Sequence, residues 1–189
     1  KLVFEWLEKS VKTADPEARE KMHNASTMAG MAFANAFLGM SHSMAHKIGA
    51  VHHTVHGRTN AILLPYVIRY NGTRPSKTTT WPKYNYWKAD EKFQDIAKML
   101  GLPHSTPEEA VEAYAKAVYE LGVAVGIKMN FKDQGIDEKA WKDSLHEIAL
   151  LAYEDQCSPA NPRLPMVADM EEIMADAYYG YAERPGRRK

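Results

Sequence analysis

The sequence has one cysteine, no net charge and no long apolar run. The lone Cys157 rules out an internal disulfide and a cysteine zinc cluster. The 24 basic residues balance the 24 acidic residues, so no overall field favours nucleic acid or an anionic membrane. Residues 1–30 lack the pattern of a signal peptide, and the most apolar stretch, residues 25–40, is too short to span a bilayer. These absences predict a cytoplasmic protein without a nucleic-acid or membrane partner.

Phosphate-binding loops and strand signals are missing as well. The sequence contains neither G-x-G-x-x-G nor G-x-x-x-x-G-K-[ST], and strands do not alternate with helices. We therefore expect that a nucleotide-binding domain is absent from this chain. The chain also begins at Lys1, in a segment that already has a helical pattern, which indicates a piece of a longer protein.

Helical spacing and helix-start signals run through most of the sequence. Apolar residues at positions 2, 3, 6, 7 and 11 form one helical face. Asp15 and Thr106, each followed by proline, and Asp137 are typical helix caps. We expect Gly39 to end or kink the second helix and Pro65 to start or kink another. The sequence therefore predicts an all-α helical bundle, with further helices from residue 41 and over residues 60–70, 90–100, 106–121, 137–153 and 166–178.

Three segments depart from this regular pattern. Small residues between positions 25 and 39 should let another helix or a ligand approach the backbone closely. Residues 71–89 carry lysines and four aromatics; such a loop can stack on single-stranded nucleic acid, but we favour a surface excursion whose aromatics pack back on the domain. Residues 184–189 form a basic tail that we predict to be disordered, which leaves residues 1–183 as the helical domain.

Five of the eight histidines lie within fifteen residues, at positions 42, 46, 52, 53 and 56. On a helix, His42 and His46 share one face, and a turn after Gly49 would bring His56 back toward it. Imidazoles that converge in this way suit a first-row divalent metal, so we interpret the cluster as a metal or catalytic site. We interpret the three remaining histidines as ordinary hydrogen-bonded residues: His23, His104 and His146.

The histidine spacing also excludes some chemistry. Zinc metalloproteases with an H-x-x-x-H pair need glutamate after the first histidine, and Ser43 stands at that position here. Cys157 has no activating neighbour in the sequence. We therefore expect neither a protease nor a cysteine hydrolase.

Motifs in and around the cluster carry a family resemblance. They are G-M-S-H-S-M-A-H-K-I-G at 39–49, H-G at 56–57 and N-A-I-L-L-P at 60–65, and they resemble the conserved C-terminal block of iron-dependent (group III) alcohol dehydrogenases. Residues 29–39, 67–71, 155–157, 160–163 and 177–180 are similar to the bifunctional aldehyde–alcohol dehydrogenase branch. The resemblance covers nearly the whole chain. It implies the C-terminal helical part of an enzyme that interconverts acetaldehyde and ethanol, small-molecule substrates, with NAD as cofactor.

The resemblance also implies roles for single residues. In the family, four protein ligands hold Fe²⁺ or Zn²⁺: an aspartate and a histidine from an earlier D-x-x-x-H helix, and two later histidines that map onto His42 and His56. His46 maps onto a histidine that lines the substrate and nicotinamide cleft without binding metal. A catalytic proton relay is thus implied for His46, and contact with the cofactor for His46 and His56. We expect Met44 and Phe37 to pack in the core rather than line this cleft.

The D-x-x-x-H pair is missing here, since no histidine has an aspartate four residues before it. We therefore expect the isolated chain to bind metal weakly and to be inactive. Val55 also replaces a proline that is common in relatives, which leaves His56 in register. Two alternatives stay open: a structural or assembly module, because the resemblance implies homo-oligomers or filaments, and a simple metal-binding helical domain. The motifs at 161–163 and 178–180 disfavour a polyol or butanol dehydrogenase.

Overall fold

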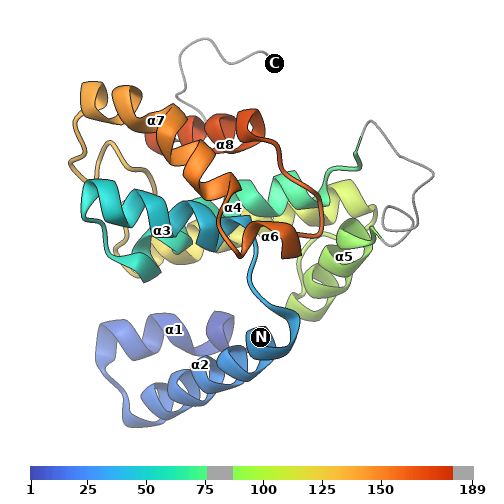
Figure 1. Ribbon diagram of the computed structural model, residues 1–189. Coiled ribbons are helices and arrows are strands. Elements are labelled where there is room, and N and C mark those ends of the chain that lie inside the picture. The colour runs from blue at the N-terminus through green and yellow to red at the C-terminus, as the bar shows by residue number, and fades with distance from the viewer. Residues whose placement is uncertain (76–86, 181–189) are drawn as a thin grey trace.

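The computed structural model describes residues 1–75 and 87–180, and within these ranges the chain is helical without any strand (Figure 1). The helices are α1 Leu2–Thr13, α2 Pro16–Ala36, α3 Met40–His52, α4 His56–Gly72, α5 Ala89–Leu100, α6 Pro107–Ala124, α7 Glu138–Tyr153 and α8 Val167–Tyr179, with a short 3₁₀ helix, η2, at Ser158–Ala160. The predicted all-α fold class is confirmed. Most of the predicted aromatic loop and all of the basic tail lie outside the described residues.

The predicted helix caps form in the structure. The side-chain oxygens of Asp15, Thr106 and Asp137 each accept a hydrogen bond from the backbone N–H three residues further on, at 2.9, 3.2 and 2.9 Å. The carboxylate of Glu109 reaches back to the N–H of Ser105 at 2.7 Å. These bonds satisfy backbone donors that the first turn of a helix leaves without a partner, and therefore fix where α2, α6 and α7 begin.

Two helix boundaries differ from the prediction. Helix α2 ends at Ala36, before Gly39, because Phe37 adopts φ 64° and ψ −176°, far from helical geometry. Gly39 is instead the N-cap of α3. Helix α4 begins at His56 and continues through Pro65, so the predicted helix start at this proline is wrong. The ring of Pro65 is buried, and this packing offsets the backbone hydrogen bond that proline cannot donate.

The main apolar core lies between α3, α4, α7 and α8. Its largest buried side chains are Met40, Met44, Ile48, Ile62, Leu63, Tyr66, Phe131, Trp141, Ile148, Met170, Met174 and Tyr178. A smaller core joins α4 to α6 through Ile68, Val111 and Ala115. Burial of apolar surface stabilises a fold by roughly 25 cal/mol per Å². Because α4 contributes to both cores, it is held on two sides.

Helices α1 and α2 form a hairpin that packs mainly within itself, below the other helices in the view of Figure 1. In α2, Ala18 is buried, whereas Met28, Met31 and Phe33 are exposed. Most of the small residues of α2 are exposed as well. The predicted close approach of another helix or a ligand to the backbone along this stretch therefore stays a prediction.

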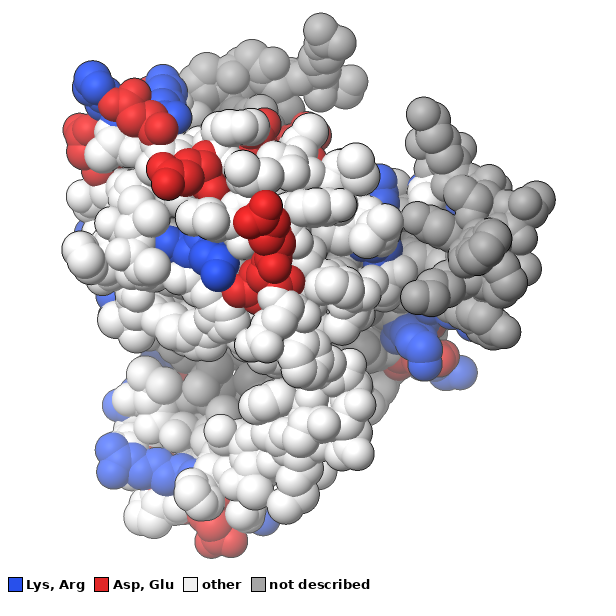
Figure 2. Space-filling model, in the orientation of Figure 1, with Lys and Arg blue, Asp and Glu red and all other residues white. Residues whose placement is uncertain are grey.

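Charged side chains of both signs are scattered among uncharged ones on the face that Figure 2 shows. This distribution agrees with the equal numbers of basic and acidic residues in the sequence. None of the helices in the two described ranges is both long enough and apolar enough to cross a membrane.

Candidate metal centre

Helices α3 and α4 carry the clustered histidines. Helix α3 begins where the amide oxygen of Asn161 accepts the N–H of Met40 at 3.2 Å. Spacing of four residues then gives His42 and His46 one face of α3. The helix ends at His52. Its C-cap residue, His53, has a left-handed φ of 54°, and the chain reverses so that α4 begins at His56. The predicted turn after Gly49 is thus found, a few residues further along the chain.

Three imidazole rings converge at this reversal. The ring centroids of His42 and His56 are 5.3 Å apart, and those of His46 and His56 are 5.4 Å apart and nearly parallel, at 20°. His42 and His46 meet edge to face at 6.1 Å. The structure therefore brings together the three histidines to which the family resemblance gave metal, cofactor or catalytic roles, and the separate role of each stays a prediction.

Burial favours the form of His42 that can bind a metal. Desolvation, followed by the neighbouring His56 and His46, lowers the pKa of His42 below its ordinary value of 6.5. An imidazole must be neutral to offer a lone pair to a metal ion. The donor set of the convergent rings thus fits a divalent first-row metal such as Fe²⁺ or Zn²⁺.

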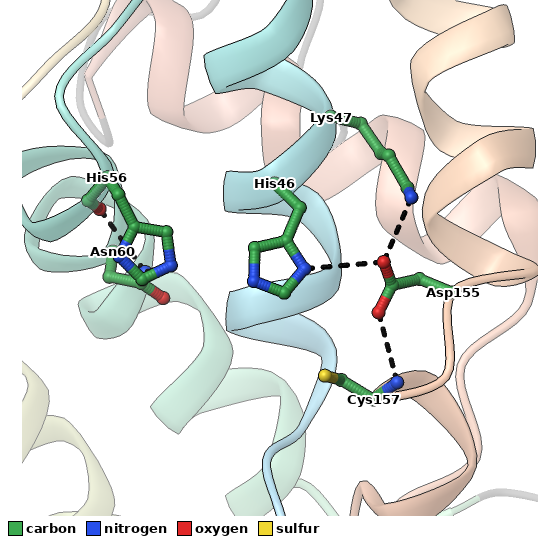
Figure 3. Close-up of polar contacts among 6 residues, drawn as sticks. All are labelled: His46, Lys47, His56, Asn60, Asp155 and Cys157. Carbon is green, nitrogen blue, oxygen red and sulfur yellow. Dashed lines mark hydrogen bonds and ion pairs between the residues drawn. The ribbon is translucent and has the colours of Figure 1, made fainter.

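Asn60 holds His56 in place. The Nδ2 atom of Asn60 lies 3.2 Å from His56 Nε2 and 3.2 Å from the His56 carbonyl oxygen, one turn earlier in α4 (Figure 3). The hydroxyl of Ser41, on α3, donates to the Asn60 amide oxygen at 3.0 Å. This bond fixes the amide with its NH₂ group toward His56, so α3 and α4 orient the imidazole together.

The other histidines lie outside the convergent group. His52 stacks on Trp141 at 5.3 Å between centroids, and its Nε2 lies 3.0 Å from the Ser144 hydroxyl. His104 contacts a backbone carbonyl oxygen, His146 contacts the carboxylate of Glu171 at 2.5 Å, and two more are exposed: His23 and His53.

The sequence did not predict that residues after α7 contact the histidine-bearing helix. Asp155 and Cys157 follow α7 and meet His46 and Lys47 of α3 (Figure 3). The contact between His46 and Asp155 spans 109 positions in sequence. The D-Q-C motif at 155–157 carried part of the family resemblance, but no local periodicity links it to the histidines.

The two residues expected in the core behave differently. Met44 is fully buried, as predicted. Phe37 is 49% exposed, so its predicted core position is wrong within the described residues. Its positive φ turns the chain out of α2 at this point.

Residues 1–178 match the family described as "Fe-containing alcohol dehydrogenase family, C-terminal", and the chain belongs to this family. It is 80% identical over 189 residues to the aldehyde-alcohol dehydrogenase of Streptococcus pneumoniae serotype 2 (strain D39 / NCTC 7466), and 38% identical over 185 residues to the bifunctional aldehyde-alcohol dehydrogenase of Escherichia coli (strain K12). These matches cover 100% and 95% of this chain and 21% of each relative. The resemblance stated from the sequence is confirmed.

A solved structure has the same fold. The iron-containing alcohol dehydrogenase from Thermococcus thioreducens superposes with a TM-score of 0.77 at 34% identity, and the match covers 95% of this chain and 42% of that one. The chain therefore spans about a fifth of the length of the curated relatives named above and less than half of this structure.

Proposed function

We propose that this chain is part of an NAD-dependent alcohol dehydrogenase that interconverts acetaldehyde and ethanol, within a bifunctional aldehyde–alcohol dehydrogenase. The convergence of His42, His46 and His56 carries this proposal. Membership of the iron-containing alcohol dehydrogenase family supports it, as do relatives named aldehyde-alcohol dehydrogenase. The helical domain over residues 1–183, a cytoplasmic location and assembly into homo-oligomers or filaments belong to the same proposal.

His42 and His56 are the proposed protein ligands of Fe²⁺ or Zn²⁺ from this chain. Their rings come from different helices, and the burial that lowers the pKa of His42 favours the neutral form that a ligand must have. A bound metal supplies Lewis acidity toward an alcohol or aldehyde oxygen, and a bound nicotinamide supplies the hydride chemistry. Metal sites in enzymes need at least three protein ligands, so two are too few for tight binding by this chain alone.

His46 is the proposed proton carrier, and the nicotinamide is proposed to contact His46 and His56. Oxidation of an alcohol removes a hydride from carbon and a proton from oxygen. An imidazole titrates near neutral pH and therefore serves either direction of this proton transfer. Its ring lies beside those of both proposed ligands, which places it close to any oxygen that a metal at this site would bind.

Metal binding by the isolated 189-residue chain tests the ligand count. Calorimetry with Zn²⁺, or with Fe²⁺ without oxygen, should detect only weak binding, and His42→Ala or His56→Ala should abolish it. His146→Ala, which alters an exposed histidine outside the group, is the matched control. Tight one-to-one binding by the monomeric chain would contradict the proposal that two ligands are missing.

Two other functions are distinguished by assays of this chain and of the longer protein. Self-association, with no dehydrogenase activity even in the longer protein, would favour a structural or assembly module. Metal binding without NADH-dependent reduction of acetaldehyde in the longer protein would favour a simple metal-binding domain. The exposed apolar residues of α2 are the feature that favours the first alternative, because exposed apolar surface can mark a contact between proteins.

A further inference from the structure

Asp155 lies against the histidine group from a segment that follows α7. Its Oδ2 atom lies 3.3 Å from His46 Nδ1 and 2.9 Å from the ammonium nitrogen of Lys47, and its Oδ1 atom accepts the N–H of Cys157 at 3.0 Å (Figure 3). The Asp155 side chain is only 8% exposed. Donors from α3 and from the Cys157 backbone therefore surround one nearly buried carboxylate.

These donors keep Asp155 ionised. Burial alone would raise the pKa of Asp155, but hydrogen bonds from the Cys157 backbone, Lys47 and His46 outweigh it and hold the pKa well below the ordinary value of 3.8. An ionised carboxylate has acceptors only. A neutral His46 that contacts it must therefore carry its proton on Nδ1, which leaves the lone pair on Nε2.

The free nitrogen of His46 is directed to the proposed site. In Figure 3 the ring nitrogen that does not contact Asp155 is on the side of the imidazole toward His56. The ring centroid of His46 lies 5.4 Å from that of His56 and 6.1 Å from that of His42, so both proposed ligands are close to this ring. The nitrogen that carries the lone pair is therefore the one on the far side of the ring from Asp155, on the side of His56.

A second metal site at this position is the competing explanation, because ligand atoms of His46, Asp155 and Cys157 lie within 4.8 Å of one another. Two observations argue against it. The ammonium group of Lys47 already neutralises the Asp155 carboxylate. Burial, followed by the nearby carboxylate, raises the pKa of the Cys157 thiol, whereas a metal ligand must be a thiolate.

We propose that Asp155 is a positioning residue, which holds His46 in the Nδ1–H tautomer and aims its Nε2 lone pair at the substrate oxygen. The inference deepens the proposed function and rests on it for the role of His46. Lys47 supports the arrangement by keeping Asp155 charged, and the Cys157 N–H fixes the direction of the carboxylate. Loss of a group that orients a catalytic histidine selects the wrong tautomer and lowers turnover.

The tautomer is tested directly by ¹⁵N NMR of the histidines in the metal-free 189-residue chain, in spectra recorded on the neutral imidazoles. Wild-type His46 should have a protonated Nδ1 and an unprotonated Nε2. In Asp155→Asn, the amide oxygen still accepts the Cys157 N–H, so the amide NH₂ group faces His46. His46 Nδ1 must then accept a hydrogen bond, which favours the tautomer with the proton on Nε2. An Nε2–H tautomer in the wild type, or the same tautomer in both proteins, would overturn the proposal.

Asp155→Asn leaves Lys47 without its nearly buried partner and can therefore unfold the chain. The double variant Asp155→Asn/Lys47→Met removes both charges and keeps the amide toward His46, so the same change of tautomer is expected. Glu171→Gln is the matched control, because Glu171 forms a carboxylate–imidazole pair with His146 away from the histidine group. It should leave the ¹⁵N signals of His46 unchanged.

Kinetics of the complete metal-loaded enzyme separate positioning from a structural effect. Asp155→Asn should lower kcat about 10- to 100-fold with metal content intact, as for other residues that orient site histidines. In a His46→Ala background the same substitution should add less than about twofold, because its effect passes through His46. An equal loss in both backgrounds would contradict positioning. Unchanged turnover in His46→Ala alone would instead refute the proposed role of His46, whatever its tautomer.

Discussion

Helices α2 and α3 follow one another in the chain but differ in how they are held. Helix α2 has 21 residues and buries Ala18 alone, whereas α3 has 13 residues and buries Met40, Ser43, Met44, Ala45 and Ile48. Helix α3 packs on α4 and α7, and the Asn161 side chain accepts a hydrogen bond from the N–H of Met40 in its first turn. The difference teaches that the histidine-bearing helix is fixed by long-range contacts, while the preceding hairpin is held mainly by itself.

Replacing a methionine with alanine should lower the stability strongly in α3 and hardly at all in α2. Met44→Ala removes a fully buried side chain of α3 and should lower the free energy of unfolding by about 2–5 kcal/mol, because it leaves a cavity. Met31→Ala removes a side chain of α2 that is 65% exposed and should change it by less than about 0.5 kcal/mol. Urea unfolding measures both. Equal losses would mean that α2 is buried as deeply as α3.

Alanine in place of glycine sharpens the contrast at the start of α3. A Cβ on Gly39 would lie 2.8 Å from Asn161 Oδ1, so Asn161 must move and its bond to the Met40 N–H is lost. We expect a loss of about 1–3 kcal/mol. A Cβ on Gly30, inside α2, meets nothing within 4 Å, and helix propensity should stabilise that variant by about 0.5–1 kcal/mol. Thermal unfolding distinguishes a loss from a gain, and a gain for Gly39→Ala would show that Asn161 does not hold α3.

The pH dependence of stability offers a smaller contrast. The pKa of His42 is lowered in the folded chain from 6.5, so the unfolded chain binds more protons just below that pH. Stability of the metal-free chain should therefore fall as the pH drops from about 7 through 6.5 toward the folded pKa. His52, whose pKa is also lowered by burial and then by His53, adds to the same slope.

His42→Gln should flatten this slope, and His23→Gln on the exposed part of α2 is the matched control. Denaturant unfolding between about pH 7 and pH 5, with a chelator present, measures the effect. A slope that His42→Gln leaves unaltered, or that His23→Gln flattens equally, would place the pH sensitivity elsewhere.

The sequence predicted the helix caps and the histidine convergence, because residues close together in the chain determine both. Asp15, Thr106 and Asp137 cap helices through bonds three residues away, so the sequence contains the whole interaction. The convergence of His42 with His56 followed from a helical repeat and one turn. Both need only a short stretch of chain.

Long-range packing explains what the sequence did not predict. The contact of Asp155 with His46 depends on how α7 lies against α3, which no nearby spacing encodes. Small residues in α2 gave a pattern typical of close helix packing, yet the described residues leave most of them exposed. Burial of Pro65 likewise depends on the core around α4 rather than on its neighbours in sequence.

Metal retention in the complete enzyme tests the central claim most directly, since the three convergent histidines are assigned two different roles. Iron and zinc content should be measured in purified His42→Ala, His56→Ala and His46→Ala proteins, each with turnover of acetaldehyde and NADH. The account predicts loss of metal in the first two, and retained metal with lowered turnover in His46→Ala. Loss of metal in His46→Ala, or full metal in His42→Ala and His56→Ala, would contradict it.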